Sequence, residues 1–398
     1  MKRSLEQIAS IESEILKRVR AHPGVSRIAL ARKLRIAPST IGSYTSRLVA
    51  EGFLLDSERG QFEVGRPPTA LRLNPEGGQF IGVDFEARNI MAMAVDFSDR
   101  PLRQAHKTIQ RSDSAAAIIK KIEKAITDVL PEDHARLLAI GVGVPGLVDP
   151  VNGVAVHYKY INNWKNIPLA APLARRFGVP VYLENCVRSM ALAELWFGQG
   201  RGVTDWLCFG IRSGIGVGIV AGGQLQHGAT FRAGEVGRWS CPLSSRTATH
   251  FFDSVASDRL ELQDIASARA IVAALERGRK AGEKSLLSAK EGSVDFSDVV
   301  QAALQRDKLT VQIVQVAAEA LGWAVAKLAL ALDPSLVILA GPLTSLGDIL
   351  LDPLRARAEQ ILRAAAGSVP NIVSSSMGEY SGALGAAALA VHEWKPAR

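Results

Sequence analysis

Cysteine is scarce in this chain of 398 residues, which has only Cys186, Cys208 and Cys241. The three form no Cys-x-x-Cys pair, and an odd, sparse count fits a reducing cytoplasm better than a disulfide framework. A disulfide-held secreted scaffold is therefore excluded, and we expect a cytoplasmic protein.

Long apolar runs are also missing. Residues 1–7 are polar and charged and lack the apolar core of a signal peptide, so no export is expected. The most apolar later stretch, 321–341, is interrupted by Lys327 and by Asp333 and Pro334, whereas a membrane span needs about 20 apolar residues. The sequence predicts a helix, a turn and a buried strand there, and no membrane partner.

Acidic residues are fewer than basic ones, and the imbalance is local. The net charge is +8, and residues 1–75 hold 13 Lys and Arg against 7 Asp and Glu, which is +6 of that total. Such asymmetry favours a head that binds a polyanion. Charge alone is equally compatible with an ordinary solvated basic face.

Three apolar-periodic stretches in this basic region predict helices at 7–20, 26–34 and 39–51, with Pro38 suited to the first turn of the third. Two short strands, 52–56 and 61–64, then predict a wing around a Gly-containing turn. The order is that of a helix-turn-helix, whose second element enters the major groove. Residues 1–74 are therefore predicted to be a winged helix-turn-helix DNA-binding domain. A helical protein–protein module with a basic rim is the alternative.

Small polar side chains on one side of the third helix are the candidate DNA contacts, because Ser and Thr can reach base edges or phosphates. Arg near the end of that helix suits a phosphate, and Arg in the Gly-Arg-Pro-Pro stretch after the wing suits the backbone or the minor groove. The candidates are Ser39, Thr40, Ser43, Tyr44, Arg47 and Arg66. Double-stranded operator DNA is the expected partner.

From residue 79 the pattern changes to an α/β one. A hairpin is predicted at 80–96, a helix at 115–129 and a buried strand at 138–144. A further buried strand ends at Asn185 and Cys186, just before an Ala-rich helix. Because α/β sheets present ligand-binding groups at the carboxyl ends of their strands, this junction is a candidate site.

The succession of Asn185 and Cys186, the glycine-rich stretch 209–219 and Glu235-Val236-Gly237-Arg238 resembles the ROK family of sugar-responsive repressors and sugar kinases. The resemblance implies an actin-like (ribonuclease H-like), two-lobed α/β sugar-kinase fold behind the head. The first lobe is expected at 79–184, completed by the C-terminal helix 382–398, and the second at 185–381.

The residues that kinase chemistry needs are altered. Where the family's kinases have an Asp that takes the proton from the sugar hydroxyl, this chain has Cys186, and a thiol of pKa about 8.5 is a poor base at neutral pH. The kinases' glycine-rich phosphate loop is replaced by Asp84 to Asn89, without glycine. The family's zinc-ligating His is Arg238, and Cys241 and His250 cannot complete four ligands. We expect no enzyme activity, no catalytic residue, no zinc and no ATP cofactor.

The residues that bind the sugar in the family are better preserved. The resemblance assigns ligand contacts to Gly146, Asn185, Cys186, Glu235, Arg238 and Asp253. The loop at 158–164, with Trp164, corresponds to a sugar-side loop, although Asn and Trp are also common in turns and cores. Cys186 and Arg238 together suit an acidic effector, because Arg pairs well with carboxylate or phosphate.

We therefore expect a DNA-binding transcriptional regulator that represses sugar-utilisation genes and whose kinase-like domain binds a sugar or sugar derivative without phosphorylating it. A homodimer or a dimer of dimers, with a near-palindromic operator, is expected. Two alternatives remain open: an active ROK sugar kinase with an appended DNA-binding head, and a constitutive repressor whose sensor serves only for dimerisation.

Overall fold

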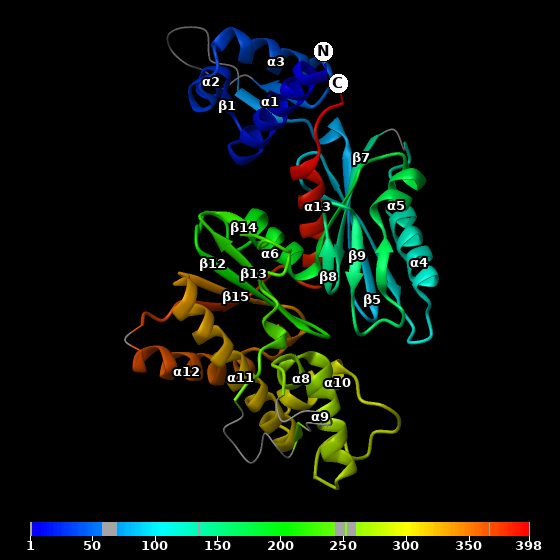
Figure 1. Ribbon diagram of the computed structural model, residues 1–398, viewed down its shortest axis with the longest axis vertical. Helices are drawn as coiled ribbons and strands as arrows, with labels where there is room; N and C mark the ends of the chain where they lie inside the picture. Colours follow the sequence, from blue (N-terminus) through cyan, green and yellow to red (C-terminus); the bar gives the residue numbers. More distant parts are fainter. Residues whose placement is uncertain are drawn as a thin grey trace. The chain divides into compact units, whose positions relative to one another are not determined.

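The computed structural model of the chain describes residues 2–57, 70–133, 136–242, 251–252, 260–365 and 367–397 (Figure 1). It consists of two compact units. The first comprises residues 1–184 and 386–398, and the second comprises residues 185–385. The chain therefore passes between the units twice, once after Glu184 and once within the last helix.

The N-terminal head belongs to the first unit. Its helices are α1 (Lys2–Ala21), α2 (Arg27–Leu34) and α3 (Pro38–Ala50). Its short antiparallel strands, in the order β1-β3-β2, are β1 (Val25–Ser26), β2 (Leu54–Ser57) and β3 (Ala70–Leu73). Apolar side chains from all three helices, among them Val19, Leu30 and Leu48, are fully buried between them. The strand expected at 61–64 lies outside the described residues, and β2 pairs instead with β3.

Local signals fix the connection between α2 and α3. Ser26 begins α2 by accepting a hydrogen bond from the Ala29 N–H, which satisfies one of the unpaired donors of the first turn. Arg35 ends α2 in the left-handed conformation, with φ 55°. Pro38 then opens α3, where its missing N–H is no loss. The two helices are thus joined by a tight turn.

The first unit continues with a five-stranded sheet in the order β11-β7-β4-β5-β6. Its strands are β4 (Gln79–Phe85), β5 (Asn89–Asp96), β6 (Pro101–Thr108), β7 (Leu137–Val144) and β11 (Val181–Asn185). The α-helices are α4 (Ala115–Asp128) and α5 (Ala170–Phe177), and η1 (Pro75–Gly77) is one turn of 3-10 helix. A small sheet in the order β10-β9-β8 is formed by β8 (Leu147–Asp149), β9 (Val154–His157) and β10 (Lys165–Pro168).

The second unit is built around a sheet in the order β14-β13-β12-β15-β16. Its strands are β12 (Trp206–Ile211), β13 (Ile215–Ala221), β14 (Gln224–Gln226), β15 (Leu336–Ala340) and β16 (Asn371–Ser374). Its helices are α6 (Cys186–Phe197), α8 (Gln263–Ala266), α9 (Ala268–Lys280), α10 (Phe296–Leu304), α11 (Lys308–Leu332) and α12 (Asp348–Ala364), with short turns η3 (Val236–Arg238) and η4 (Pro342–Leu346). The last helix, α13 (Ser381–Glu393), starts in this unit and ends in the first.

The two large sheets have the same topology. In each, three consecutive strands form an antiparallel meander, and two later strands extend the sheet on the free side of the first strand of that meander. Thus β4 pairs antiparallel with β5 and parallel with β7, as β12 does with β13 and β15. The duplication is the one expected of an actin-like fold.

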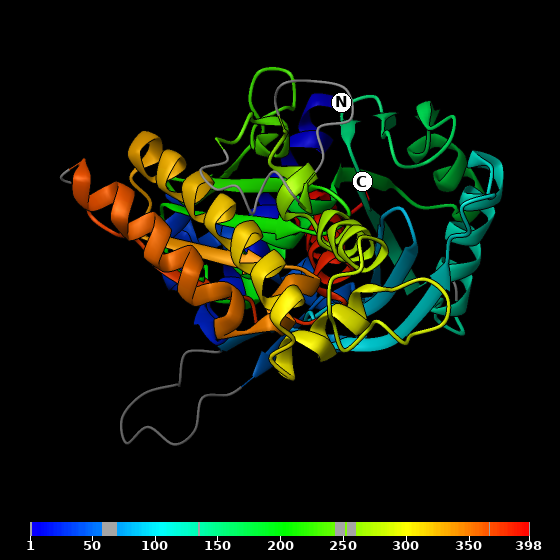
Figure 2. The same ribbon diagram turned by 90° about the horizontal axis from the view of Figure 1, so that it is seen from below.

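Side-chain alternation along the strands separates two apolar layers in the second unit. Leu207, Phe209 and Ile211 of β12 join the core beneath α11 and α12, which lie side by side (Figure 2). Trp206 and Cys208 face the opposite way and pack with α6. The sheet is therefore covered on both faces, as expected of a strand that is apolar at every position.

Helix α11 contains most of the apolar stretch noted in the sequence. It is the one helix in the described ranges that is long and apolar enough to cross a membrane, and 72% of its apolar window is buried inside the fold. A core helix has the same composition, so the length and hydropathy of α11 are weak support for a membrane span. The charged stretch 276–291 is partly helical, because α9 continues to Lys280.

Candidate functional site

The first turns of α3 expose the polar side chains expected to contact DNA. Ser39, Thr40 and Ser43 are exposed, while Ile41 and Leu48 on the other side are fully buried. Tyr44 is half-buried. Their contact with DNA stays a prediction, and Arg66 lies outside the described residues.

Arg47 has a structural role that the sequence pattern does not reveal. Its Nε donates to Glu12 Oε1 at 2.7 Å, and its guanidinium lies 5.3 Å from the Tyr44 ring centroid. Glu12 is completely buried, whereas the Arg47 side chain is 38% exposed. A buried carboxylate without a partner is strongly unfavourable, so Arg47 holds α3 against α1. Contact with a phosphate remains a prediction for its exposed part.

A second arginine joins the helix-turn-helix to the wing. Arg27, at the start of α2, donates through Nε to Thr45 Oγ1 of α3 at 2.8 Å and through Nη2 to Asp56 Oδ2 of β2 at 2.9 Å. One side chain therefore fixes three elements of the head relative to one another.

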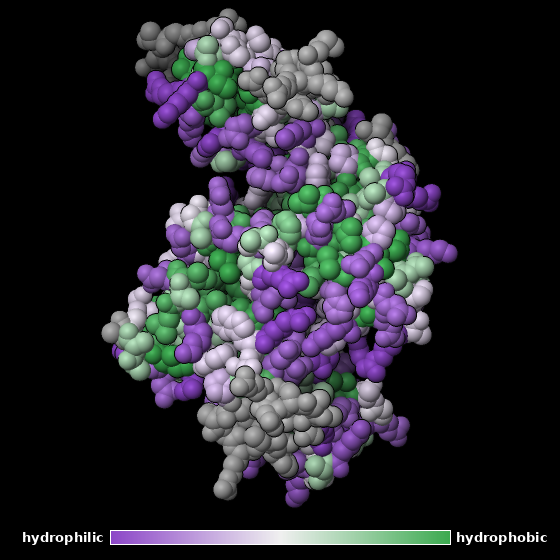
Figure 3. Space-filling view, viewed as in Figure 1, coloured by the Kyte–Doolittle hydropathy of each residue, from purple (hydrophilic) through white to green (hydrophobic). Residues whose placement is uncertain are grey.

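Three further basic residues lie at the end of α2 and in the turn before α3. Arg32, Lys33 and Arg35 are exposed, and none of them forms an ion pair within the described part of the chain. Figure 3 shows hydrophilic side chains at the left and lower margins of the head, beside a smaller hydrophobic group. Exposed Lys and Arg next to a recognition helix suit phosphate contacts. The signal in the sequence is the basic run 32–35, which lies outside the third helix from which most of the candidate DNA contacts were taken.

In the second unit, the candidate ligand residues begin at the junction of β11 and α6. Asn185 begins α6, because its Oδ1 accepts the N–H groups of Val187 at 2.9 Å and Arg188 at 3.3 Å. Asn185 is 8% exposed and Cys186, the first residue of the helix, is 7% exposed. The helix cap therefore fixes Cys186, which the resemblance assigns to the position of the kinases' catalytic Asp.

The glycines of the second hairpin are needed for packing. A Cβ at Gly210 would overlap the Val187 side chain, and one at Gly218 would overlap the Ala191 Cβ. Val187 and Ala191 are one turn apart on α6, so they present one face to the bare strands. The run of glycines lets α6 lie directly on β12 and β13.

Glu235 is held by glycines on both sides. Gly234 has φ +84°, and a Cβ there would overlap the Val217 carbonyl oxygen. A Cβ at Gly237 would likewise meet the Ile215 carbonyl. The loop thus rests directly on β13. Burial raises the pKa of Glu235 above its ordinary value, and the positive charges of Arg238, Arg188 and Arg232 oppose that rise.

Arg188 is a site residue that the sequence analysis missed. Its side chain is buried, with the residue 2% exposed, and its Nη1 donates to the Phe231 carbonyl oxygen at 3.2 Å. Arg232 and Arg238, by contrast, are exposed. Three guanidinium groups therefore act electrostatically on the single carboxylate of Glu235. The available signal was a charge in the otherwise apolar start of α6.

The remaining candidates are placed as follows. Gly146, in the first unit, has φ +75°, and a Cβ there would overlap the His157 carbonyl, so the loop requires glycine. Trp164 is 1% exposed and its ring lies 5.3 Å from that of Phe85, which makes it a core residue and not a surface for a sugar.

Asp253, the last candidate ligand residue, lies outside the described residues. All ligand contacts remain predictions.

The described residues contain no group of three or more His, Cys, Asp and Glu side chains that could hold a metal. Cys241 is buried, which raises the pKa of its thiol to about 11 and makes it a poor ligand at neutral pH. His250 lies outside the described residues, so the absence of zinc stays a prediction.

These elements define a class of protein in which a head of the DNA-binding helix-turn-helix type is joined to a duplicated, actin-like α/β domain. Residues 80–393 match the ROK family, and residues 9–54 match the winged helix-turn-helix DNA-binding family. The chain belongs to the ROK family, and the expected fold class is confirmed. With its head, it is a transcriptional regulator of that family.

Similar proteins include both regulators and kinases. The putative xylose repressor of Caldicellulosiruptor sp. (strain Rt8B.4) is 28% identical, over 86% of this chain and 85% of its own length. The glucokinase of Thermotoga maritima is 29% identical, over 78% of this chain and 96% of its own. A crystal structure of a ROK family transcriptional regulator, a homologue of the Escherichia coli MLC protein, superposes with a TM-score of 0.78 at 23% identity, covering 97% of each chain.

Removing the partner of Glu12 should weaken the head. We expect Arg47→Met to lower the opening free energy of α1 and α3 by about 2 kcal/mol, below the 3–5 kcal/mol of a fully buried pair because Arg47 is partly exposed. Arg18→Met, which breaks an exposed pair with Glu14, should cost about 0.5 kcal/mol or less. Hydrogen exchange of the full-length chain measures both. Equal losses would contradict the role of Arg47.

Neutralising the basic run should weaken DNA binding uniformly across sequences. For Arg32→Ala with Lys33→Ala, we expect the slope of log affinity against log salt concentration to become shallower by about 1.8, or about 0.9 for each lost phosphate contact. Lys280→Ala with Lys284→Ala, which removes the same charge from exposed positions of the second unit, should leave the slope unchanged. Fluorescence anisotropy with a labelled duplex at several salt concentrations tests this, and identical slopes for both pairs would refute it.

Proposed function

We propose that this chain is a sugar-responsive transcriptional repressor. Its head binds operator DNA, and its ROK domain binds a sugar or sugar derivative that changes the affinity for DNA. The observation that carries the proposal is the combination, in one chain, of a DNA-binding head with a ROK domain that has Cys186 at the position of the kinase base. The similarity to xylose repressors over 86% of the chain supports the same function.

We infer that the sensor does not transfer phosphate. Loss of a general base typically costs about 10²–10⁴ in rate. The turn between β4 and β5, where the kinases hold ATP phosphates, is closed by a hydrogen bond from the Glu86 N–H to the Asn89 carbonyl and has no glycine. The same considerations support a domain without ATP or zinc. An active kinase is the second candidate, favoured by the similarity to the Thermotoga maritima glucokinase.

We further propose that the protein acts as a homodimer or a dimer of dimers. A two-fold arrangement of heads requires operator half-sites separated by whole helical turns. Selection of bound duplexes from a random pool should therefore enrich a near-palindrome.

The decisive experiment combines DNA selection with an effector screen. We expect the selected duplex to bind tightly, and at least one of xylose, glucose, N-acetylglucosamine and glucuronate to change that affinity about 5- to 150-fold. An ATP-coupled assay on the same sugars should show turnover far below about 1 s⁻¹. Brisk phosphorylation of a sugar would favour the kinase. Binding of DNA that no sugar alters in this panel, with no thermal shift, would favour a constitutive repressor.

The charges around Glu235 favour an anionic effector. The guanidinium groups of Arg188, Arg232 and Arg238 all act electrostatically on its carboxylate. Arg recognises carboxylate and phosphate through paired hydrogen bonds, so a sugar acid or sugar phosphate is the proposed ligand class.

The pH dependence of binding tests this ligand class. Ionised Glu235 repels an anion, so the affinity for glucuronate should rise as the pH falls through the raised pKa of Glu235. A neutral sugar that donates hydroxyl hydrogen bonds to the carboxylate should instead lose affinity. Calorimetry from neutral pH down to 4.5, the ordinary pKa of Glu, distinguishes the two by the sign of the change in affinity. Glu235→Gln, the control, should flatten either profile. Binding confined to neutral sugars would contradict the anionic class.

A further inference from the structure

The last helix, α13, connects the candidate ligand helix to the DNA-binding head through three close contacts. It begins in the second unit and continues, without a break, into the first at Ala386. Its contacts lie at its start, at the point where it passes from one unit to the other, and just beyond its end.

At its start, α13 lies directly on α6. A Cβ at Gly385 would overlap the Ser189 carbonyl oxygen, so the two helices approach with only backbone between them. Ser189 directly follows Arg188, and the same helix begins with Asn185 as its cap. Any shift of α6 toward or away from α13 must therefore displace α13, because no flexible side chain separates them.

The next residue contacts the first sheet in the same way. A Cβ at Gly141 of β7 would overlap the Ala386 carbonyl oxygen. Gly385 and Ala386 are adjacent, so one turn of α13 makes a close backbone contact within the second unit and another within the first.

Beyond its end, the chain joins a cluster of four aromatic rings. The ring centroid of Trp394 lies 5.3 Å from that of Phe53, 5.8 Å from that of Phe80 and 5.9 Å from that of Phe97. Phe53 lies between α3 and β2 of the head, whereas Phe80 is in β4 and Phe97 follows β5. Aromatic pairs at these distances contribute about 0.5–1.5 kcal/mol each beyond their buried area. The cluster therefore joins the head, the first sheet and the end of α13.

An ion pair reinforces this junction. Arg20 of α1 donates through Nε to Asp99 Oδ2 and through Nη2 to the Phe97 carbonyl, both at 2.8 Å. The side chains of Arg20 and Asp99 are 10% and 11% exposed. Removing either partner would leave a buried charge. The head is thus attached to the first sheet by specific, desolvated contacts.

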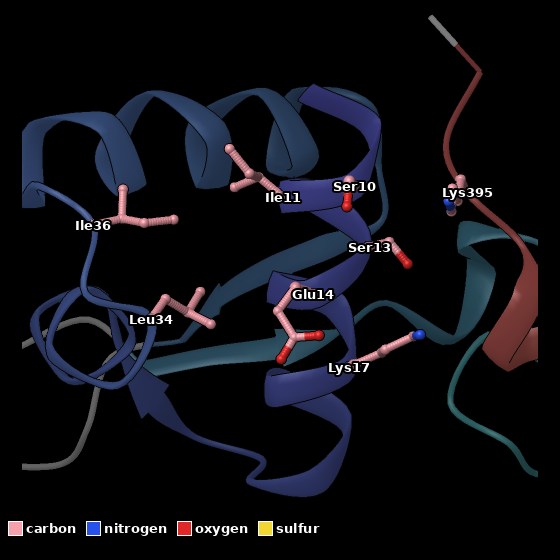
Figure 4. A pocket seen from close by; sticks show the side chains of 8 residues that line it. All are labelled: Ser10, Ile11, Ser13, Glu14, Lys17, Leu34, Ile36 and Lys395. Atoms are coloured by element: carbon pink, nitrogen blue, oxygen red, sulfur yellow. The ribbon is translucent and has the colours of Figure 1, made fainter. Parts of the chain in front are cut away.

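The C-terminal residues after Trp394 continue along the head. Lys395 lines a pocket of about 390 Å³ together with α1 and the end of α2 (Figure 4). Lys17 of α1 lies with its Nζ 3.4 Å from His392 Nε2. The end of the chain therefore contacts α1 as well as Phe53.

We propose that α13 transmits the state of α6 to the DNA-binding head, with Trp394 as the residue that connects the helix to the head. The proposal rests on the sugar-responsive function above and adds the route by which the sensor acts. Coupling requires a chain of packed elements that both sites bias. In this protein the series of packed elements runs from α6 to α13, then to Trp394, and from Trp394 to Phe53 of the head.

A double-mutant cycle tests the route without requiring an effector. Gly385→Ala forces α13 away from α6, and it should change the affinity for the selected duplex by about fivefold or more, the lower end of typical couplings. Trp394→Leu should reduce the effect of Gly385→Ala to less than about twofold, and Trp394→Phe should restore it. Anisotropy with the selected duplex gives all the affinities.

The matched control is Trp164→Leu. Trp164 is a buried Trp of the first unit whose ring packs on Phe85, which is not one of the rings around Trp394, so the fivefold effect of Gly385→Ala should persist in its background. Each variant is first checked for a cooperative thermal transition. If Gly385→Ala does not fold, Gly141→Ala, which displaces the same helix from β7, takes its place.

The outcomes separate the two proposals. Wild-type protein that binds no duplex contradicts the proposed function. Wild-type protein that binds duplex, with equal effects of Gly385→Ala in the wild-type, Trp394→Leu and Trp164→Leu backgrounds, overturns the route through α13 and leaves the proposed function intact.

Discussion

The packing of α6 directly against backbone is the constraint on which the second unit depends. On one side, Val187 and Ala191 occupy the space that Gly210 and Gly218 leave free. On the other, Gly385 brings α13 onto the Ser189 carbonyl. Protein interiors are close-packed, so a helix held this way has no room to shift alone. The glycines of the stretch 209–219, which resembles the ROK family, are thus explained by packing.

This constraint also fixes the candidate ligand groups. Asn185 caps the helix, Cys186 is its first residue and Arg188 reaches the loop before Glu235. All are therefore fixed by the position of α6. A ligand that binds more tightly to one position of α6 than to another can shift the protein only by that difference in affinity. A site on a rigid helix can change shape only together with the elements packed against it.

The sequence predicted the fold better than the site. Strand alternation, the Ser26 cap and Pro38 are local signals, so the helices of the head and the strands predicted at 80–96 and 138–144 lie close to where the pattern places them. The charged contacts could not be predicted in this way. Arg47 pairs with a residue 35 positions earlier, and Arg188 donates to a carbonyl 43 positions later. Nothing in a local pattern specifies such partners, and Trp164 is buried although its neighbours suggested a sugar contact.

A kinase domain that has lost its base is well suited to sensing. Turnover would consume the effector, whereas a regulator needs the effector to stay bound for as long as its concentration persists. The buried Arg20 and Asp99 pair and the rings around Trp394 attach the head to the first sheet, so the head need not change its own fold to respond. Regulation then requires only a small difference in free energy between two positions of α6, because 1–3 kcal/mol of coupling already changes affinity about 5- to 150-fold. Under the proposed function, replacing the catalytic residue while keeping the packing around it would turn a binding site for a substrate into one for a signal.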